Sequence, residues 1–489
     1  HCHSKPSIVN CNMKKILSII CCAGALFLTS CERFLTEVSK SSITPENSFT
    51  TATDWNKALT SAYAMLQLVF VDKYTITLNE FGTDEVQPFD LSWAAYTELM
   101  NYTFNSSHEF LRCHYIWSYD GIKRCNTIID MPESTPVGSD ERQLMIAQAK
   151  FLRSIYYFDL VAMYGGVPMW TSASVDKKQI SKPREAADKV YELIVKDMSE
   201  AAEELPEKWD NQTDKGRATK YAAYALLGRF YLQWGKSQEA LDALNNVIGK
   251  YSLYSSYADI FDPANKNQEI ENIFEVQFSH SGAWGLEGSI QSSYWGPRGG
   301  GGPTAGAFGW GGFGPTQYLY DSYDSNDKRR TAFFATEYKG IKQEPPCIMK
   351  YRDPNYGNEI EDDDLNYIMM RYPDVLLMKA EALNNLGDSS NDKYECLNMV
   401  RRRAGIKEIT AADGLSKEQF ADVILEERLH ELCCEHHRRF DLVRFGKLID
   451  QVNKAYGITL KEYNNLYPIP QQAIDNNDAM SDSDQNPGY

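Results

Sequence analysis

Apolar residues recur at helical spacing along most of this chain, and that periodicity limits its possible folds more than any other feature. Hydrophobic residues make up 43% of the sequence, which is enough to fill a large core and excludes a mainly disordered chain. Pro168 and Pro206 follow two of the periodic segments, where a helix is expected to stop. We therefore predict a mainly α-helical body, with helices over residues 54–66, 141–164, 186–205, 219–234, 238–248, 367–386, 393–403 and 417–436.

One stretch predicts how these helices pair. Residues 218–251 span 34 positions, which is the period of a tetratricopeptide repeat. Leu227 and Gly228 fall where that repeat pattern places them, and Gly235 marks the turn before a second helix. A weaker version of the pattern runs through 380–387. The sequence thus predicts tetratricopeptide-like helix pairs that stack side by side, with small residues where they cross.

Two regions depart from helical spacing. Residues 70–105 are irregular, polar and aromatic, and residues 273–320 turn from a strand-like alternation into a stretch rich in Gly, Ser and aromatic residues. We interpret both as loops or small β insertions on the helical frame. Because binding residues are often carried by loops on a rigid frame, we expect a site there.

The first thirty residues predict an export signal. Lys14 and Lys15 precede an apolar run over 16–28, which is shorter than the roughly 20 residues that cross a bilayer. The run ends in 28–31, where small residues before Cys31 resemble the lipobox of bacterial lipoproteins. Cys31 would then carry two acyl chains, which anchor a protein stably. The alternative is an ordinary secretory cleavage site with an incidental cysteine.

Charge and cysteine usage narrow the function further. The net charge of −17 argues against a general nucleic-acid binder, because phosphate contacts need basic surface. Of the 11 cysteines, the six after Cys31 are sparse and form no CxxC pattern. We predict free buried thiols rather than a disulfide framework.

Motifs for catalysis or metal binding are weak. Residues 309–314 match GxGxxG by letter, but Pro315 follows where a nucleotide site needs a helix. The four residues His430, Cys433, Cys434 and His437 would share one helix face, yet a straight helix rarely turns four ligands onto one ion. The acids at 361–364 lack the glycine and the alternate spacing of a calcium loop. We therefore predict no metal, no cofactor and no catalytic residue, with metal binding left as the lesser alternative.

A series of short motifs runs in order from Cys31 to Tyr489 and resembles the SusD/RagB family of nutrient-binding outer-membrane lipoproteins. The motifs are 34–35, 149–160, 164–168, 205–206, 217–220, 222–227, 371–372, 376–381, 400–405, 426–428, 438–446, 467–470 and 485–489.

The resemblance implies a right-handed superhelical frame of tetratricopeptide-like helix pairs with loop and small β insertions. It implies one domain over 31–489, in which parts over about 31–235 and about 270–489 intertwine, after upstream residues and a signal peptide over 1–30. The protein would be anchored through Cys31 on the outer face of the outer membrane. It would capture an oligosaccharide or polysaccharide and load it into a SusC-like TonB-dependent transporter, without catalysis.

The binding residues follow from the chemistry of sugars. Aromatic rings stack on the C–H faces of sugar rings, while amides, carboxylates and guanidinium groups bind the hydroxyls. The aromatic candidates in the two irregular regions are Trp93, Tyr96, Trp284, Tyr294, Trp295 and Trp310. The polar candidates are Asp84, Gln291 and Arg298, with Glu85, Gln87 and Asp90 beside them. For each loop tryptophan the alternative is a small local core beneath the loop.

Three other functions stay open at this point. The same fold could bind peptides, which would use backbone hydrogen bonds and fewer tryptophans. A surface glycoside hydrolase would need a pair of carboxylates about 5–10 Å apart, which spacing in sequence cannot show. A structural adaptor would bind proteins and no small ligand.

Overall fold

The computed structural model describes residues 49–173, 180–280, 287–300, 308–353 and 361–489. Its contacts divide the chain into His1–Thr50 and Thr51–Tyr489. The elements below belong to the second of these units.

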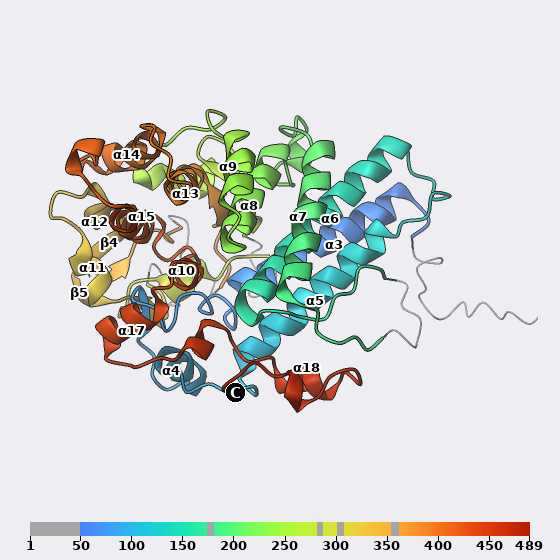
Figure 1. The fold of residues 1–489 in the computed structure, drawn as a ribbon, viewed down its shortest axis with the longest axis horizontal. Coiled ribbons are helices and arrows are strands. Elements are labelled where there is room, and N and C mark those ends of the chain that lie inside the picture. The colour runs from blue at the N-terminus through green and yellow to red at the C-terminus, as the bar shows by residue number, and fades with distance from the viewer. Residues whose placement is uncertain (1–48, 174–179, 281–286, 301–307, 354–360) are drawn as a thin grey trace, which may run out of the picture. The chain divides into compact units, whose positions relative to one another are not determined.

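A row of helices, each packed against the next, forms the frame of this unit (Figure 1). The row starts with α3, α5 and α6 at the right of the view and ends with α13, α14 and α15 at the upper left. The prediction of a mainly helical body built from helix pairs is confirmed. The frame helices are α3 (Ala52–Val71), α5 (Glu109–Ile129), α6 (Ser139–Tyr164), α7 (Ala187–Glu204), α8 (Lys220–Gln233), α9 (Ser237–Asn245), α13 (Tyr372–Asn385), α14 (Asp392–Ala404) and α15 (Lys417–Leu432).

The pair α8–α9 shows why this sequence forms packed hairpins. The Thr219 hydroxyl caps α8 by accepting a hydrogen bond from the Ala222 N–H at 3.3 Å. Gly235 has a φ of 80°, which lets the chain turn sharply into α9. At Gly228 a Cβ atom would lie 2.4 Å from Leu244 Cδ2 of α9. The two helices therefore cross where only glycine leaves room, as the repeat spacing predicted.

Short helices and strand pairs fill the space beside the frame. Figure 1 places β4, β5, α10, α11, α12, α17 and α4 at the left and lower left. The strands pair antiparallel as β1 (Val86–Pro88) with β3 (Phe313–Pro315), β2 (Asn272–Val276) with β6 (Tyr367–Arg371), and β4 (Phe334–Tyr338) with β5 (Ile341–Ile348). The short α-helices are α4 (Ala94–Asn101), α10 (Gln291–Trp295), α11 (Gln317–Ser322), α12 (Lys328–Phe333), α16 (Arg438–Arg444), α17 (Leu448–Tyr456) and α18 (Gln471–Asp475). The 3₁₀ helices are η3 (Gln212–Asp214), η4 (Tyr257–Ile260), η5 (Pro263–Asn265), η7 (Ala411–Asp413), η8 (Glu462–Asn465) and η9 (Asp482–Asp484).

Two predicted helices were wrong at one end. The segment 367–386 begins as strand β6, because Pro373 sits in the first turn of α13 and the residues before it pair with β2. The segment 417–436 leaves the helix at Leu432, and Cys434 and His436 adopt left-handed φ angles of 62° and 66°. The helix α5 was not among the predicted ranges.

The six described cysteines are free, and all but Cys113 are buried, which confirms the predicted thiols. Among the described helices none is long and apolar enough to cross a membrane.

Candidate functional site

The structure joins the two irregular regions that the sequence singled out. Strand β1 pairs antiparallel with β3, so that Gln87 lies opposite Gly314. Just beyond this pair the Gly312 carbonyl accepts hydrogen bonds from the N–H groups of Phe89 and Asp90, at 2.8 and 3.0 Å. A Cβ atom on Gly314 would lie 2.7 Å from the Phe89 ring. Segments more than two hundred residues apart therefore form one surface.

A buried cluster of rings lies under this surface. Tyr96 is at its centre, with ring centroids 5.1 Å from Phe81, 5.6 Å from Phe110 and 5.9 Å from Phe313. Trp295 packs edge-on against Phe313 at 4.7 Å. These five rings form a rigid floor because each contacts others from a different segment.

Above the floor lie four aromatic side chains that reach the surface, which we call the aromatic platform: Tyr74, Trp93, Tyr294 and Trp310. The first three are half-buried, whereas Trp310 is 51% exposed. Trp93 packs against Tyr74 and Tyr96, with centroid distances of 5.8 and 4.7 Å. Tyr294 lies 6.0 Å from Phe313, and the N–H of Trp310 donates to the carbonyl of Ser293 at 2.6 Å. The rings of Tyr74, Trp93 and Tyr294 thus pack on the floor, whereas Trp310 is positioned through its backbone.

Carboxylates border the aromatic platform. The Tyr294 hydroxyl donates to Glu361 Oε1 at 3.1 Å, and the N–H of Tyr74 donates to Asp72 Oδ1 at 3.0 Å. Burial, followed by the charge of Glu361, raises the pKa of Tyr294 above its usual range. Burial likewise raises the pKa of Asp72, with Glu361 adding to the effect. Glu361 therefore lies close enough to interact with both Tyr294 and Asp72.

Four predicted ligand contacts are corrected by burial, since their side chains are at most 1% exposed. Tyr96 and Trp295 belong to the floor described above. Asp84 pairs with Arg438 at 2.6 Å, and Gln291 Nε2 donates to Ser289 Oγ and to the carbonyls of Leu365 and Asn366. The local-core alternative therefore applies to Trp295. These side chains shape the site from below and do not reach its surface.

The other predicted residues are partly exposed or lie outside the described residues. Trp93, Tyr294 and Trp310 reach the surface in the aromatic platform, so their contact with ligand stays a prediction. Arg298 is half-buried, with its guanidinium 3.8 Å above the Phe89 ring. Trp284 and the lipidation residue Cys31 lie outside the described residues.

Sequence reasoning missed Tyr74, Asp72 and Glu361. Tyr74 and Asp72 fall inside the irregular region 70–105, so its aromatic and acidic content was the available signal. Glu361 was considered only as one of the acids at 361–364 that fail the pattern of a calcium loop, and its contact with Tyr294 brings it to the site.

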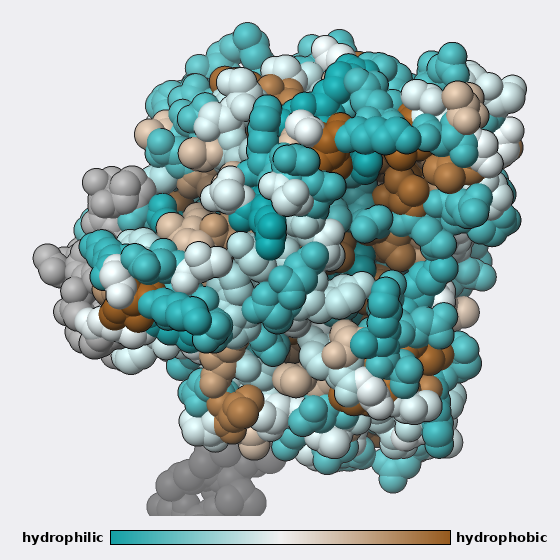
Figure 2. Space-filling model, turned by 90° about the vertical axis from the view of Figure 1, so that its left-hand side faces the viewer, coloured by the Kyte–Doolittle hydropathy of each residue, from teal (hydrophilic) through white to brown (hydrophobic). Residues whose placement is uncertain are grey.

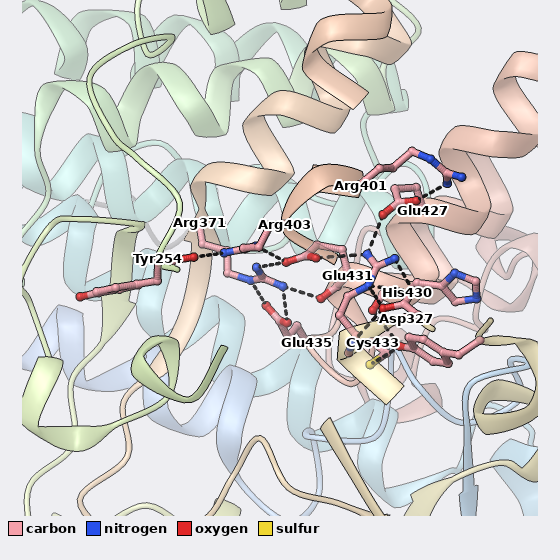
Figure 3. Close-up of polar contacts among 12 residues, drawn as sticks. Tyr254, Asp327, Arg371, Arg401, Arg403, Glu427, His430, Glu431, Cys433 and Glu435 are labelled. Carbon is pink, nitrogen blue, oxygen red and sulfur yellow. Dashed lines mark hydrogen bonds and ion pairs between the residues drawn. The ribbon is translucent and has the colours of Figure 1, made fainter. Parts of the chain in front are cut away.

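Another cluster of chemistry-bearing residues lies inside the C-terminal half (Figure 3). Glu431 on α15 contacts Arg371 at 2.6 Å, Arg403 at 2.5 Å and Arg329 at 3.2 Å. Burial alone would raise the pKa of Glu431, but the three guanidinium groups outweigh burial and hold it well below its usual range. The remaining ion pairs of the cluster are Arg329 with Asp327 and Glu427, Arg401 with Glu427, Arg371 with Glu271 and Glu435, Arg403 with Glu271, and Lys350 with Glu435.

This buried network, as we call it, is a structural clamp. Its acids and bases are paired and shielded from solvent, and removing one partner from such a pair is strongly destabilising. It joins α12, β6, α14 and α15, and each of its carboxylates is held by at least one guanidinium or ammonium group. The network therefore does not resemble a catalytic site.

The residues of the weak metal motifs make other contacts in the structure. Because α15 ends at Leu432, His430 and His437 no longer share a helix face with the cysteines. His430 Nε2 lies 2.9 Å from Ser322 Oγ, and Cys433 Sγ accepts from the Tyr323 hydroxyl at 3.3 Å. In the described part of the chain, no three His, Cys, Asp or Glu side chains are grouped to hold a metal ion. The GxGxxG segment leads into strand β3 rather than into a helix.

Two clefts lie elsewhere in the unit. A mainly apolar cleft of about 400 Å³ is lined by residues of α5 and α18 together with Trp170. A more polar cleft of about 750 Å³ lies beside α3 and β2. Neither is lined by residues of the aromatic platform.

The surface seen from the left of Figure 1 is mainly hydrophilic, with hydrophobic residues in scattered groups (Figure 2). Two of the large hydrophobic side chains that are exposed in the described residues, Leu91 and Trp310, lie beside or within the platform. Their exposure is informative because they adjoin other partly exposed rings.

Comparisons with known proteins cover both halves of the chain. A family model described as "SusD family" matches residues 340–489, and one described as "Starch-binding associating with outer membrane" matches residues 12–232. The "SusD-like protein P25" of Formosa agariphila is 27% identical, covering 97% of this chain and 100% of its own. A "Laminarin binding SusD-like protein" is 26% identical with a TM-score of 0.78, covering 90% of this chain and 100% of its own. The "Surface glycan-binding protein A" of Bacteroides thetaiotaomicron, solved with laminarihexaose, has 23% identity and a TM-score of 0.72, covering 89% of this chain and 100% of its own.

Proposed function

Because this chain belongs to the SusD/RagB family, we propose that it is a non-catalytic glycan-binding protein of the bacterial cell surface. It captures oligosaccharides or polysaccharides and delivers them to a SusC-like TonB-dependent transporter. A lipid on Cys31 holds it to the outer membrane, on the side facing the cell exterior.

The aromatic platform carries this proposal. Sugar rings bind to proteins through stacking on aromatic faces combined with hydrogen bonds to their hydroxyls. The platform provides partly exposed rings at Trp93, Tyr294 and Trp310, and the bordering carboxylates of Asp72 and Glu361 accept hydrogen bonds. A peptide site would instead use backbone hydrogen bonds and would depend less on exposed rings.

The relatives support the same function. Printed descriptions of similar proteins name laminarin and laminarihexaose as ligands, and one of the matching family models names starch and the outer membrane. The predicted leader with its lipobox-like end at Cys31 fits this location.

Calorimetry on the purified mature chain with a panel of neutral and acidic oligo- and polysaccharides tests the proposal. The same samples are assayed for new reducing ends. We expect binding of at least one glycan without hydrolysis. Turnover would identify a glycoside hydrolase instead, with Asp72 and Glu361 as the first carboxylates to examine.

A substitution locates the site. We expect Trp310→Ala to weaken binding about five- to thirtyfold, because stacking of a sugar ring on one aromatic ring is worth roughly 1–2 kcal/mol. Leu386→Ala is the matched control, since Leu386 is also an exposed large hydrophobic residue, at 44%, but lies at the end of α13. Equal affinity of both variants and the unaltered chain would place the ligand elsewhere. Trp295→Ala is unsuitable because Trp295 is part of the buried floor.

A further inference from the structure

The polar cleft of about 750 Å³ beside α3 and β2 has the composition of a sugar-binding site. Its floor is apolar, because Leu66, Val276 and Phe278 are at most 8% exposed. The neutral side chains on its rim that can hydrogen-bond to a ligand are those of Gln67, Gln212, Thr213 and Ser279. An apolar floor below amides and hydroxyls fits the C–H faces and the hydroxyl groups of a sugar, and the volume lies in the range of roughly 300–1,000 Å³ that ligand pockets have.

These rim groups are available to a ligand. Gln67 Nε2 donates to the Gln277 carbonyl at 2.7 Å, and Gln67 Oε1 accepts no hydrogen bond within the described part of the chain. The other three side chains are exposed and make no hydrogen bond to any described residue; they are Gln212, Thr213 and Ser279. A bound sugar therefore does not have to break protein hydrogen bonds at these groups.

The wall of the cleft at the end of β2 is held in place. Gly216 has a φ of 88°, and a Cβ atom there would lie 2.5 Å from Gln277 Cδ, so that the 212–217 segment packs closely on the residue after β2. The Gln277 amide exchanges hydrogen bonds with the Asn267 amide at 2.7 and 3.0 Å and accepts one from Asn366 at 3.2 Å. A wall fixed in this way lowers the cost of ordering the site when a ligand binds.

Charged side chains do not define the ligand of this cleft. Arg217 pairs with Asp214 at 3.1 Å and donates to Asn56 Oδ1 at 2.9 Å, so its guanidinium is engaged by the protein. Lys215 and Glu287 are exposed on the rim and carry opposite charges. The ligand class therefore follows from the amides and hydroxyls, which bind the hydroxyl groups of a glycan.

The cleft and the aromatic platform share two segments of the chain. The residues of α3 that line the cleft have the spacing of one helix face; they are Thr60, Tyr63, Ala64 and Gln67. Asp72 caps the same helix, and Tyr74 of the platform follows it. From Gln67 to Asp72 the helix rises only about 7–8 Å. The segment 287–300 likewise carries Glu287 on the cleft and Tyr294 on the platform, so the two sites are neighbours along both segments.

We propose that this cleft is a second contact site for the glycan and takes sugar units beyond those on the aromatic platform. The inference rests on the proposed function, since it extends the same binding to a longer ligand. When one ligand engages two sites, the second contact forms within the complex and raises the overall affinity. The affinity of the chain should therefore rise with glycan length beyond the length that fills the platform.

The experiment measures dissociation constants as a function of glycan length. The probes are oligosaccharides of increasing length, from disaccharide to decasaccharide, prepared from the glycan that binds best in the calorimetry panel, with fragments of laminarin and starch as the first choices. Calorimetry on the purified mature chain gives the dissociation constant for each length. We expect the affinity of the unaltered chain to rise again after the length at which the platform is filled.

Two substitutions in the cleft test its part in that rise. Ala64→Leu fills part of the cleft from an exposed position on α3, and it should abolish the gain for long oligosaccharides. Gln212→Ala removes an open amide from the rim and should weaken binding of long oligosaccharides about three- to tenfold, as expected for one lost hydrogen bond. Ala332→Leu on α12 and Gln238→Ala on α9 are the matched controls, since both positions are exposed and lie outside the cleft and the platform.

The outcomes separate this inference from the proposed function. Weaker binding of long but not of short oligosaccharides by either folded cleft variant, with both controls unchanged, supports the second site. One affinity for all lengths in the unaltered chain, or long-chain affinity that neither folded cleft variant changes, overturns the second site, and glycan binding that Trp310→Ala weakens still supports the proposed function. No glycan binding by the unaltered chain overturns the proposed function and this inference with it. If circular dichroism shows that one cleft variant does not fold, the other variant decides.

Discussion

Glu431 is the residue on which the buried network depends most, because its carboxylate lies between Arg329, Arg371 and Arg403. We predict that Glu431→Gln lowers the free energy of unfolding by about 3–5 kcal/mol, since it leaves three buried guanidinium groups short of a counter-charge. Urea denaturation followed by circular dichroism measures the change. The exposed Glu207→Gln should stay within about 0.5 kcal/mol of the unaltered chain. A loss below 1 kcal/mol for Glu431→Gln would show that the network is not a clamp.

A second residue-scale prediction concerns pH. Glu80 and Glu85 are both buried, and burial is the main cause that raises the pKa of Glu80 from 4.5 to about 7. The folded chain therefore keeps a proton that the unfolded chain releases near pH 4.5. Because the folded state binds more protons in this window, its stability falls as pH rises from about 4.5 to about 7.

Glu80→Gln mimics the protonated side chain and should remove the contribution of Glu80 to this pH dependence, while Glu85, whose pKa burial also raises, keeps its own. Between pH 5 and pH 8 we expect the variant to lose about 2–3 kcal/mol less stability than the unaltered chain, measured by urea denaturation at each pH. Buried His436 and His437, whose pKa values burial lowers to about 3 and about 4, act below pH 6.5 and affect both chains alike. Parallel stability curves for the two chains would show that the pKa of Glu80 is not raised in the folded chain.

At the scale of elements, the crossing of α8 and α9 sets how the frame is stacked. A methyl group on Gly228 would lie 2.4 Å from Leu244 Cδ2, so Gly228→Ala must push the two helices apart or displace Leu244. We predict a loss of about 1–3 kcal/mol in the free energy of unfolding, although alanine is the better helix former. The paired test is Gly228→Ala in a Leu244→Ala background, where the added methyl group has room and should no longer destabilise. If Gly228→Ala is neutral in both backgrounds, the close crossing is incorrect.

The sequence identified elements well where the signal was local. Apolar spacing located α6, α7, α8 and α14 within a few residues. Pro373 carried a helix-start signal that would have placed the start of the predicted helix 367–386 correctly. The end of α15 had no such local signal. There Glu80 and Glu85 accept hydrogen bonds from the N–H groups of His436 and Cys434, and these contacts cross more than three hundred residues.

The candidate site was predictable as a region and only partly as residues. Trp295 and Trp310 come from the same Gly-rich stretch, yet Trp295 is 1% exposed and Trp310 is 51% exposed. What separates them is the packing of Phe313 and Tyr351 on Trp295, and β3 carries Phe313 into place only by pairing with β1. Composition can thus mark where rings gather, but the partner strand decides which ring is covered.

At the scale of the whole molecule, function depends on where the chain is held as much as on its site. In the proposed function, a glycan bound on the platform can be imported only if the protein stays beside a transporter in the outer membrane. In the proposed function the link is a lipidated Cys31, and two acyl chains give the membrane binding that a single chain does not.

Cys31→Ser should therefore release the protein from the membrane without altering its ligand affinity. We expect the unaltered protein in the outer-membrane fraction, with a mass increase corresponding to acylation at Cys31, and the variant in the soluble fraction or retained behind an uncleaved leader. Cys21→Ser, within the apolar run of the leader, is the matched control and should leave anchoring unchanged. Membrane association that survives Cys31→Ser, with unchanged mass in the unaltered protein, would mean that a protein contact and not a lipid holds the chain. The transporter would then be the first candidate for that contact. Deleting the transporter should in that case release the protein from the membrane.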